Sequence, residues 1–220
     1  MDNNLLIAKI EDKIKQTKTK NKTTNSDFLN EQQIAIIEKE LSIRKEKNYF
    51  FYGGYEDALR KVIFFYPEKI TKSNVEKNID NIIGLIKISV PNEIIGKLKH
   101  KDYLGTIMSF GLTRERIGDI IVFEDKAYII ALKENCEYIK EELKQEKRFK
   151  KAKIEILKME KVETKPIKFE EIAITVNSIR LDNIVAELLN TSRNIAQKKI
   201  EEEKVFVNYL IEKWIKAQED

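Results

Sequence analysis

Basic and polar side chains recur at helical spacing near the end of the chain, in residues 178–208. At about 100° per residue, Arg193 and Gln197 fall on one side of an expected helix, with Lys198 at its margin. Ionised donors on one helix face suit phosphate oxygens, because charge-assisted hydrogen bonds are the strong ones. The spacing therefore predicts a phosphate-binding surface, and a solvated helix face is the ordinary alternative.

Two short helices are expected to position these side chains. The first has an apolar face at the spacing of a buried helix stripe, made of Leu181, Ile184, Val185 and Leu188. The second has a stripe made of Ile195, Ala196 and Ile200. Thr191 or Ser192 can cap this second helix by accepting a hydrogen bond from a free backbone N–H. Residues 205–207, Val-Phe-Val, then predict a strand.

This order of residues resembles the S4 domain, an RNA-binding helix pair named after a small-subunit ribosomal protein. The resemblance is carried by Arg180, Leu181, Asp182, Ser192, Arg193, Ala196, Ile200, Val205, Val207 and Asn208. It implies an RNA-binding surface that is formed by Arg180, Asp182, Ser192, Arg193, Gln197, Lys198 and Lys204. For Asp182 the alternative is a favourable interaction with the dipole at a helix N-terminus.

An S4 domain normally continues into a glycine-containing hairpin, which residues 209–220 do not show. Their apolar side chains stand instead at helical spacing, as Leu210, Ile211, Trp214 and Ile215. We therefore expect a truncated S4-like module in residues 172–220.

Two other segments carry side chains that suit phosphate. Residues 147–153, KRFKKAK, are the densest basic cluster and contain no acid. A phosphate-tracking surface is expected there, formed by Lys147, Arg148, Lys150 and Lys151; a solvated helix end is the alternative. Arg114 and Arg116 bracket Glu115, and their guanidinium groups can either fork onto phosphate or form an internal ion pair with Asp119 or Glu115.

The middle of the chain predicts six elements in the order β-α-β-β-α-β, the ferredoxin-like arrangement. The expected strands are residues 82–90, 119–123, 127–132 and 152–159, and the expected helices are residues 103–110 and 136–143. The RNA recognition motif shares this plan and stacks bases on strand aromatics. Here the first strand has no Phe or Tyr and the third offers only Tyr128, so base stacking is not expected.

The N-terminal residues predict a mixed α/β region. Helices are expected over residues 2–16 and from Ser26 or Asp27 onwards, with a polar loop at residues 15–25 between them. An aromatic strand from residue 49 runs into Gly53-Gly54, where a structural turn is favoured over a phosphate site. A helix from about residue 56, a strand at residues 62–66 and a linker at residues 71–78 complete the expectation.

These patterns predict an α+β fold in three domains. They are an N-terminal α/β region in residues 1–75, a ferredoxin-like domain in residues 76–165, and the S4-like helix pair plus strand in residues 172–220.

Three segments together resemble the YlmH family of bacterial S4-domain proteins. They are YGGYEDALRK (residues 52–61), HKDYLGTIMSFGLTRERIGDIIV (residues 100–122) and the S4-like tail. The resemblance implies a cytoplasmic RNA-binding protein whose partners are rRNA, tRNA and large ribosomal subunits that carry stranded peptidyl-tRNA, in ribosome-associated quality control. It implies no cofactor.

Catalysis is not expected from the sequence. His100 is the one histidine and Cys136 the one cysteine, and neither has a partner motif for nucleophilic chemistry. One His and one Cys do not make a zinc site of the usual kinds. An RNA-modifying enzyme therefore ranks last, and no metal ion or cofactor is expected.

Charge and hydropathy are those of a globular chain without a membrane segment. The 220 residues carry 41 Lys and Arg and a formal net charge of +4, so a basic surface depends on how the charges are distributed. No apolar run approaches the ~18 to 20 residues of a membrane span, and residues 1–16 alternate in charge where a secretory signal needs an apolar core. We expect a cytoplasmic protein; its oligomeric state stays open.

A protein-interaction factor linked to cell division is the alternative function. It would use the amphipathic N-terminal helices and the aromatic residues 49–66.

Overall fold

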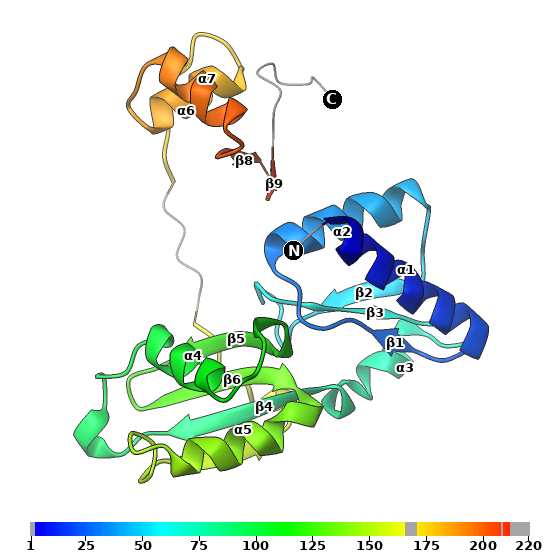
Figure 1. Cartoon of the computed structure of the whole chain (residues 1–220), viewed down its shortest axis with the longest axis vertical. Helices are drawn as coiled ribbons and strands as arrows, with labels where there is room; N and C mark the ends of the chain where they lie inside the picture. The colour runs from blue at the N-terminus through cyan, green and yellow to red at the C-terminus, as the bar shows by residue number, and fades with distance from the viewer. Residues whose placement is uncertain (1–2, 166–170, 208, 212–220) are drawn as a thin grey trace. The chain divides into compact units, whose positions relative to one another are not determined.

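The computed structural model of the chain describes residues 3–165, 171–207 and 209–211. The chain forms two compact units, residues 1–166 and residues 167–220, which are described separately. The first unit contains an N-terminal part and a ferredoxin-like part that share contacts, and the second contains a helix pair (Figure 1).

The N-terminal part packs two helices on a small antiparallel sheet (Figure 1). The helices are α1 (Asn3–Lys20) and α2 (Glu31–Ile43), and the sheet has the order β1 (Thr24–Asn25), β3 (Val62–Phe65), β2 (Tyr49–Tyr52). Asn30 caps α2, because its side chain accepts a hydrogen bond from the Gln33 backbone N–H at 2.8 Å while the Gln33 side chain accepts one from the Asn30 N–H at 2.9 Å.

Four local expectations for this part are wrong. The polar stretch after residue 15 continues α1 to Lys20, and Ser26 does not cap α2 but lies buried, where its hydroxyl accepts a hydrogen bond from the Ile63 N–H at 3.1 Å. Residues 53–61 form turns with no helix, and residues 71–78 contain the short helix α3 (Lys72–Glu76). In each case the local sequence, through its polar composition or residue spacing, predicted one structure, and tertiary contacts favoured another.

The ferredoxin-like part confirms the expected element order. It consists of β4 (Ile83–Ser89), α4 (His100–Ser109), β5 (Ile117–Val122), β6 (Lys126–Leu132), α5 (Lys133–Gln145) and β7 (Lys153–Leu157). The strands pair antiparallel in the order β5-β6-β4-β7. Short 3-10 helices lie at Ile79–Asn81, Asn92–Ile94, Arg114–Arg116 and Met159–Lys161.

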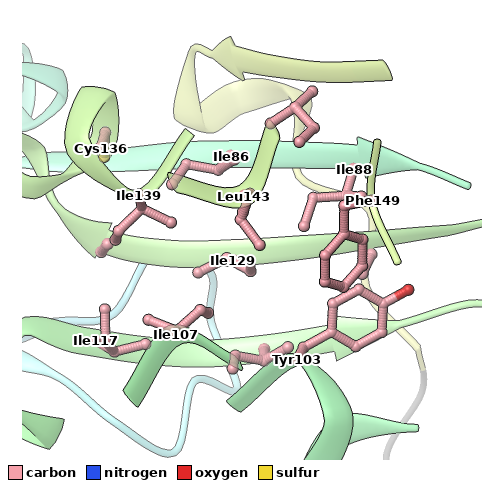
Figure 2. Close-up of a cluster of buried hydrophobic side chains, with 14 of the residues drawn as sticks. Ile86, Ile88, Tyr103, Ile107, Ile117, Ile129, Cys136, Ile139, Leu143 and Phe149 are labelled. Carbon is pink, nitrogen blue, oxygen red and sulfur yellow. The ribbon is translucent and has the colours of Figure 1, made fainter. Parts of the chain in front are cut away.

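One face of this sheet is covered by α4 and α5. Figure 2 shows the resulting core, in which strand side chains such as Ile86 and Ile129 meet Ile107 from α4 and Leu143 from α5. Each of these four side chains is fully buried. Burial of one such side chain contributes roughly 1.5–3 kcal/mol.

The opposite face of the sheet is covered at one end by the N-terminal part. Leu85 and Ile130 point to this side, because side chains alternate along a strand, and they share one buried cluster with Phe28, Val62 and Phe64. A strand that is buried on both faces reads as a continuous apolar run. The run AYIIAL in β6 therefore follows from two-sided burial.

The second unit is built from two helices and two short strands. They are α6 (Leu181–Leu188), α7 (Arg193–Glu201), β8 (Phe206–Val207) and β9 (Leu210–Ile211). Val185, Ala196 and Ile200 are buried between the helices, and β8 pairs antiparallel with β9. The helix expected from residue 210 is therefore wrong where β9 stands; Trp214 and Ile215 lie outside the described residues.

The Asp119 carboxylate joins the two parts of the first unit. It accepts hydrogen bonds from the Tyr55 hydroxyl at 2.9 Å and from the backbone N–H groups of Leu59 at 2.8 Å and Arg60 at 3.2 Å. Gly118 allows the close approach, since a Cβ atom there would lie 2.7 Å from a ring carbon of Phe28. Residues 52–61 and 113–119 are therefore one structural junction.

Replacement of Asp119 by Ala should loosen this junction. Two backbone N–H groups and a half-buried tyrosine hydroxyl lose their acceptor, which should reduce the free energy of unfolding by about 3 kcal/mol. Urea unfolding measures the change, with Asp57→Ala on the exposed part of the same loop as the control. Equal stability of the two variants would contradict the assigned role of Asp119.

Candidate nucleic-acid interface

A buried carboxylate at the start of α6 organises the charged side chains of the second unit. Asp182 is 0% exposed. Its Oδ1 and Oδ2 atoms accept hydrogen bonds from Nε and Nη2 of Arg180, both at 3.1 Å. From α7, the Arg193 Nε donates to Oδ2 at 2.6 Å and the Gln197 Nε2 donates to Oδ2 at 2.8 Å. One acid therefore holds two arginines and ties α6 to α7.

These partners keep Asp182 ionised. Hydrogen bonds from Arg180 first, and then from Arg193 and Gln197, hold the pKa of the carboxyl well below its usual range against the opposing effect of burial. Hydrogen bonding to Asp182 likewise raises the pKa of Arg180. The cluster thus carries two positive charges and one negative charge.

The arrangement leaves guanidinium donors on the surface. The Arg180 side chain is 28% exposed and the Arg193 side chain is 49% exposed. Within residues 171–207, Arg193 donates hydrogen bonds through Nε alone, so Asp182 does not use its two terminal nitrogens. Because these nitrogens are fixed, the remaining N–H groups of the two guanidinium groups are preorganised to bind an anion such as phosphate.

The other expected residues of this unit have different surroundings. Ser192 caps α7, with its Oγ accepting from the Ile195 N–H at 3.4 Å. Lys198 and Lys204 are exposed, and their Nζ atoms lie 3.9 Å and 2.6 Å from carboxylate oxygens of Glu202. Asp182 and Gln197 are therefore positioning residues, whereas Arg180 and Arg193 present donors.

Arg114 has a structural role instead of the expected phosphate contact. Its Nη1 donates to the backbone oxygens of Ile117 at 2.6 Å and Gly118 at 3.0 Å. Burial first, and then the nearby Arg60, lower the pKa of Arg114 to about 10.

Arg116 is half-exposed and paired with acids other than those expected from the sequence. Its Nη1 lies 2.6 Å from Glu134 Oε1 and 3.4 Å from Asp27 Oδ1. Neither Asp119 nor Glu115 is its partner in these contacts.

The basic cluster after α5 lies on the surface of the first unit. Lys147, Arg148, Lys150 and Lys151 are exposed. Phe149 is fully buried, with its ring centroid 5.5 Å from that of Tyr103 in α4 (Figure 2). Arg148 Nη1 also lies 3.5 Å from Asp102 Oδ1 at the start of α4. Phe149 therefore anchors the loop and turns its basic neighbours outward.

Anchoring of this loop identifies basic residues that the sequence analysis missed. Lys97, Lys99 and Lys101 are exposed around the start of α4, next to Asp102, which contacts Arg148. The lysines at every second position of GKLKHKD (residues 96–102) were a visible sign of a basic segment. Only the contact between Tyr103 and Phe149 links this segment to residues 147–151. The two segments form one basic surface, here called the α4–α5 basic surface.

Burial raises the pKa of the Cys136 thiol to about 11, so it is a poor nucleophile at neutral pH. Among the described residues, no three His, Cys, Asp or Glu side chains are grouped to hold a metal ion. No helix in the described ranges is long and apolar enough to cross a membrane.

Comparison with known proteins identifies relatives of the chain. Residues 77–175 match the family model described as "Putative RNA-binding domain in YlmH". The chain is 24% identical over 191 residues to "Ribosome-associated protein quality control protein P2" of Bacillus subtilis (strain 168), covering 84% of this chain and 70% of that protein. The solved structure of "Cell division protein ylmH from Streptococcus pneumoniae" has a TM-score of 0.57 at 20% identity, and the match covers 74% of this chain and 96% of that one. The second likeness shows a shared fold.

Replacement of Asp182 by Asn should change how the second unit responds to acid. Because the folded pKa of Asp182 is depressed, its contribution to stability is complete above the unfolded value of about 3.9 and is lost as pH falls below it. At neutral pH, Asp182→Asn should therefore destabilise α6 and α7 by about 3 kcal/mol. Amide hydrogen exchange in both helices measures this loss.

The same measurement below pH 4 supplies the second half of the test. The difference between wild type and Asp182→Asn should shrink there, because the carboxyl of the unfolded wild-type chain becomes protonated and folding must then remove that proton. Glu187→Gln, an exposed site on α6, is the control. A difference that does not change with pH would contradict an ionised, arginine-bound Asp182.

Proposed function

We propose that the chain is a member of the YlmH family, as the match of residues 77–175 to its RNA-binding domain supports, and that it binds structured rRNA and tRNA on the large ribosomal subunit, in ribosome-associated quality control. The family match supports an RNA-binding role, and the name of the Bacillus subtilis relative supports a ribosomal one. The second unit acts in this proposal as an S4-like RNA-binding module.

The observation that carries the proposal is the arginine pair held by Asp182. Arg193 is held through Nε and Arg180 through Nε and Nη2, and both side chains are partly exposed. Bidentate guanidinium contacts suit phosphate oxygens, and structured RNA is recognised largely through phosphate and shape. Two guanidinium groups held by one carboxylate can bind RNA phosphates in this way without recognising the identity of a base.

The α4–α5 basic surface provides further phosphate contacts in the first unit. Lys147, Lys150 and Lys151 are exposed there together with Lys97, Lys99 and Lys101. Two separate basic surfaces on two units allow the chain to engage two RNA segments, and linked binding sites raise the overall affinity through effective concentration.

The proposed protein is a cytoplasmic binding factor with no catalytic step and no cofactor. The unreactive environment of Cys136 supports this view.

A protein-interaction factor in cell division is the second candidate. The aromatic residues 49–66 support it less than the sequence implied, because Phe50, Phe64 and Phe65 are buried in the fold. The feature that favours it is an apolar surface on the second unit, where Leu188 and Leu189 are 50% and 53% exposed.

Co-sedimentation with purified large ribosomal subunits tests the proposed function. Arg193→Gln should weaken binding at least tenfold, because it removes one phosphate fork. Arg193→Glu is less informative, since it would set a second carboxylate against Asp182. Lys72→Gln on the exposed face of α3 is the matched control for loss of one positive charge.

Salt separates the two candidate functions. Binding through phosphate should weaken steeply between low and moderate salt, whereas an apolar protein interface should barely respond. Binding that resists salt and survives Arg193→Gln would contradict the RNA proposal and favour a protein partner.

A further inference from the structure

Half of one sheet face in the ferredoxin-like part is not covered by the N-terminal part. Along β4 and β6, Lys87 lies opposite Tyr128 and Ser89 lies opposite Lys126. All four side chains point to the face away from α4 and α5, because the side chains between them, such as Ile88 and Ala127, belong to the helix-covered core. This half of the sheet is basic and aromatic where the other half is aliphatic.

Two aromatic rings and two lysines meet on this half. Phe123 follows β5, and its ring centroid lies 6.0 Å from that of Tyr128 at an interplanar angle of 86°. Lys126 Nζ lies 5.3 Å from the Phe123 centroid and 6.0 Å from the Tyr128 centroid, and Lys87 Nζ lies 6.0 Å from the latter. Cations over aromatic faces also form the usual groove for single-stranded nucleic acid.

This cluster was not expected from the sequence. Only the first and third expected strands were considered for base stacking, and they offer only Tyr128. Pairing of β5 with β6 places Phe123 beside Tyr128, which completes a pair of rings on the face that RNA recognition motifs use for base stacking.

The chain's own segment after β7 occupies this cluster. The Glu163 carboxylate accepts hydrogen bonds from Lys126 Nζ at 2.8 Å and 2.6 Å and from the Tyr128 hydroxyl at 2.6 Å. Lys165 Nζ lies 4.9 Å from the Phe123 centroid and donates to the Val122 backbone oxygen. The Glu163 carboxylate thus lies where a phosphate would bind, and the Lys165 ammonium lies where a base edge would bind.

The cover is held by side chains near its end. Glu163 and Lys165 are exposed, and within residues 3–165 the backbone of residues 163–165 makes no hydrogen bond to the sheet. Met159, in contrast, is buried and donates its backbone N–H to Asp80 at 3.0 Å. The Glu163 side chain is 52% exposed, and an ion pair with a solvent-exposed partner contributes little to stability, so residues 163–165 can leave while Met159 stays anchored.

We propose that this half-sheet is a binding site for single-stranded RNA, in which Phe123 and Tyr128 stack bases and Lys126 binds a phosphate in the place of the Glu163 carboxylate. Residues 163–165 cover the site until RNA displaces them. The proposal rests on the RNA-binding function proposed above and adds a second kind of RNA, unpaired nucleotides, to it.

The chemistry favours RNA as the occupant. A phosphodiester carries the same single negative charge as the carboxylate that it replaces, and every base offers a π-face to an aromatic ring. Because Tyr128 is 1% exposed, its ring becomes available only when the cover leaves. The Glu163 contact is therefore the controlling interaction.

Fluorescence anisotropy of the full chain with a labelled oligouridylate tests the site. Glu163→Gln weakens the cover by removing the charge bound to Lys126, so affinity for the oligouridylate should rise about fivefold or more. Glu160→Gln, an exposed acid of the same segment, is the control for charge. Phe123→Leu in the Glu163→Gln chain should remove the gain, because one stacked base is lost.

Two further arms keep the result interpretable. An oligouridylate that carries 4-thiouridine should crosslink to Phe123 or to residues of β6 in the Glu163→Gln chain, and this result does not depend on the stability of the Phe123 variant. The affinity gain should persist together with Arg193→Gln, which impairs only the second unit. Ribosome binding that survives Arg193→Gln, together with a persistent gain for the oligouridylate, would contradict the proposed function and leave the half-sheet site supported.

Three outcomes would overturn the half-sheet site. They are equal oligouridylate affinity of Glu163→Gln and Glu160→Gln, crosslinks confined to residues other than Phe123 and those of β6, and a gain in affinity for an acidic peptide in place of RNA. The last outcome would assign the surface to a protein partner.

Discussion

Two-sided burial of the four-stranded sheet is the constraint on which the first unit depends. Strands β4 and β6 at its centre carry apolar side chains to both faces. The helices α4 and α5 cover one face, and the N-terminal part covers only one end of the other. The remaining half is covered by the segment after β7, through Glu163 and Lys165 rather than through an apolar core. This change from a permanent to a displaceable cover is what makes the half-sheet a candidate binding site.

Two buried or half-buried aspartates have related tasks with different consequences. Asp119 accepts hydrogen bonds from a tyrosine hydroxyl and two backbone N–H groups. Each of these groups has a single hydrogen to donate, so none is left for a ligand and the junction is structural. Asp182 accepts from two guanidinium groups, which have donors to spare. A carboxylate that is hydrogen-bonded to two arginines can therefore join two helices and still leave positive charge available to a ligand.

Periodicity predicted the elements better than it predicted the sites. The β-α-β-β-α-β order and the helix pair followed from apolar spacing, which burial dictates directly. The helix expected near residue 56 failed because the Asp119 carboxylate holds the backbone of residues 59 and 60 in a turn, a contact between residues sixty positions apart. Arg114 looked like a phosphate ligand for the same reason: its backbone acceptors at Ile117 and Gly118 are set by the folded loop. Phe123 was missed because strand pairing, which no single segment encodes, brings it to Tyr128.

The central claim is that Arg180 and Arg193 bind RNA phosphate through the guanidinium N–H groups that are not hydrogen-bonded to Asp182. The most direct measurement is side-chain NMR of the ¹⁵N-arginine-labelled chain during titration with a structured RNA hairpin. The account predicts that the Nη resonances of both arginines shift and sharpen as rotation slows, while the Nε–H of Arg193 keeps its signal from the hydrogen bond to Asp182. Unchanged arginine resonances together with shifts at Leu188 and Leu189 would contradict it.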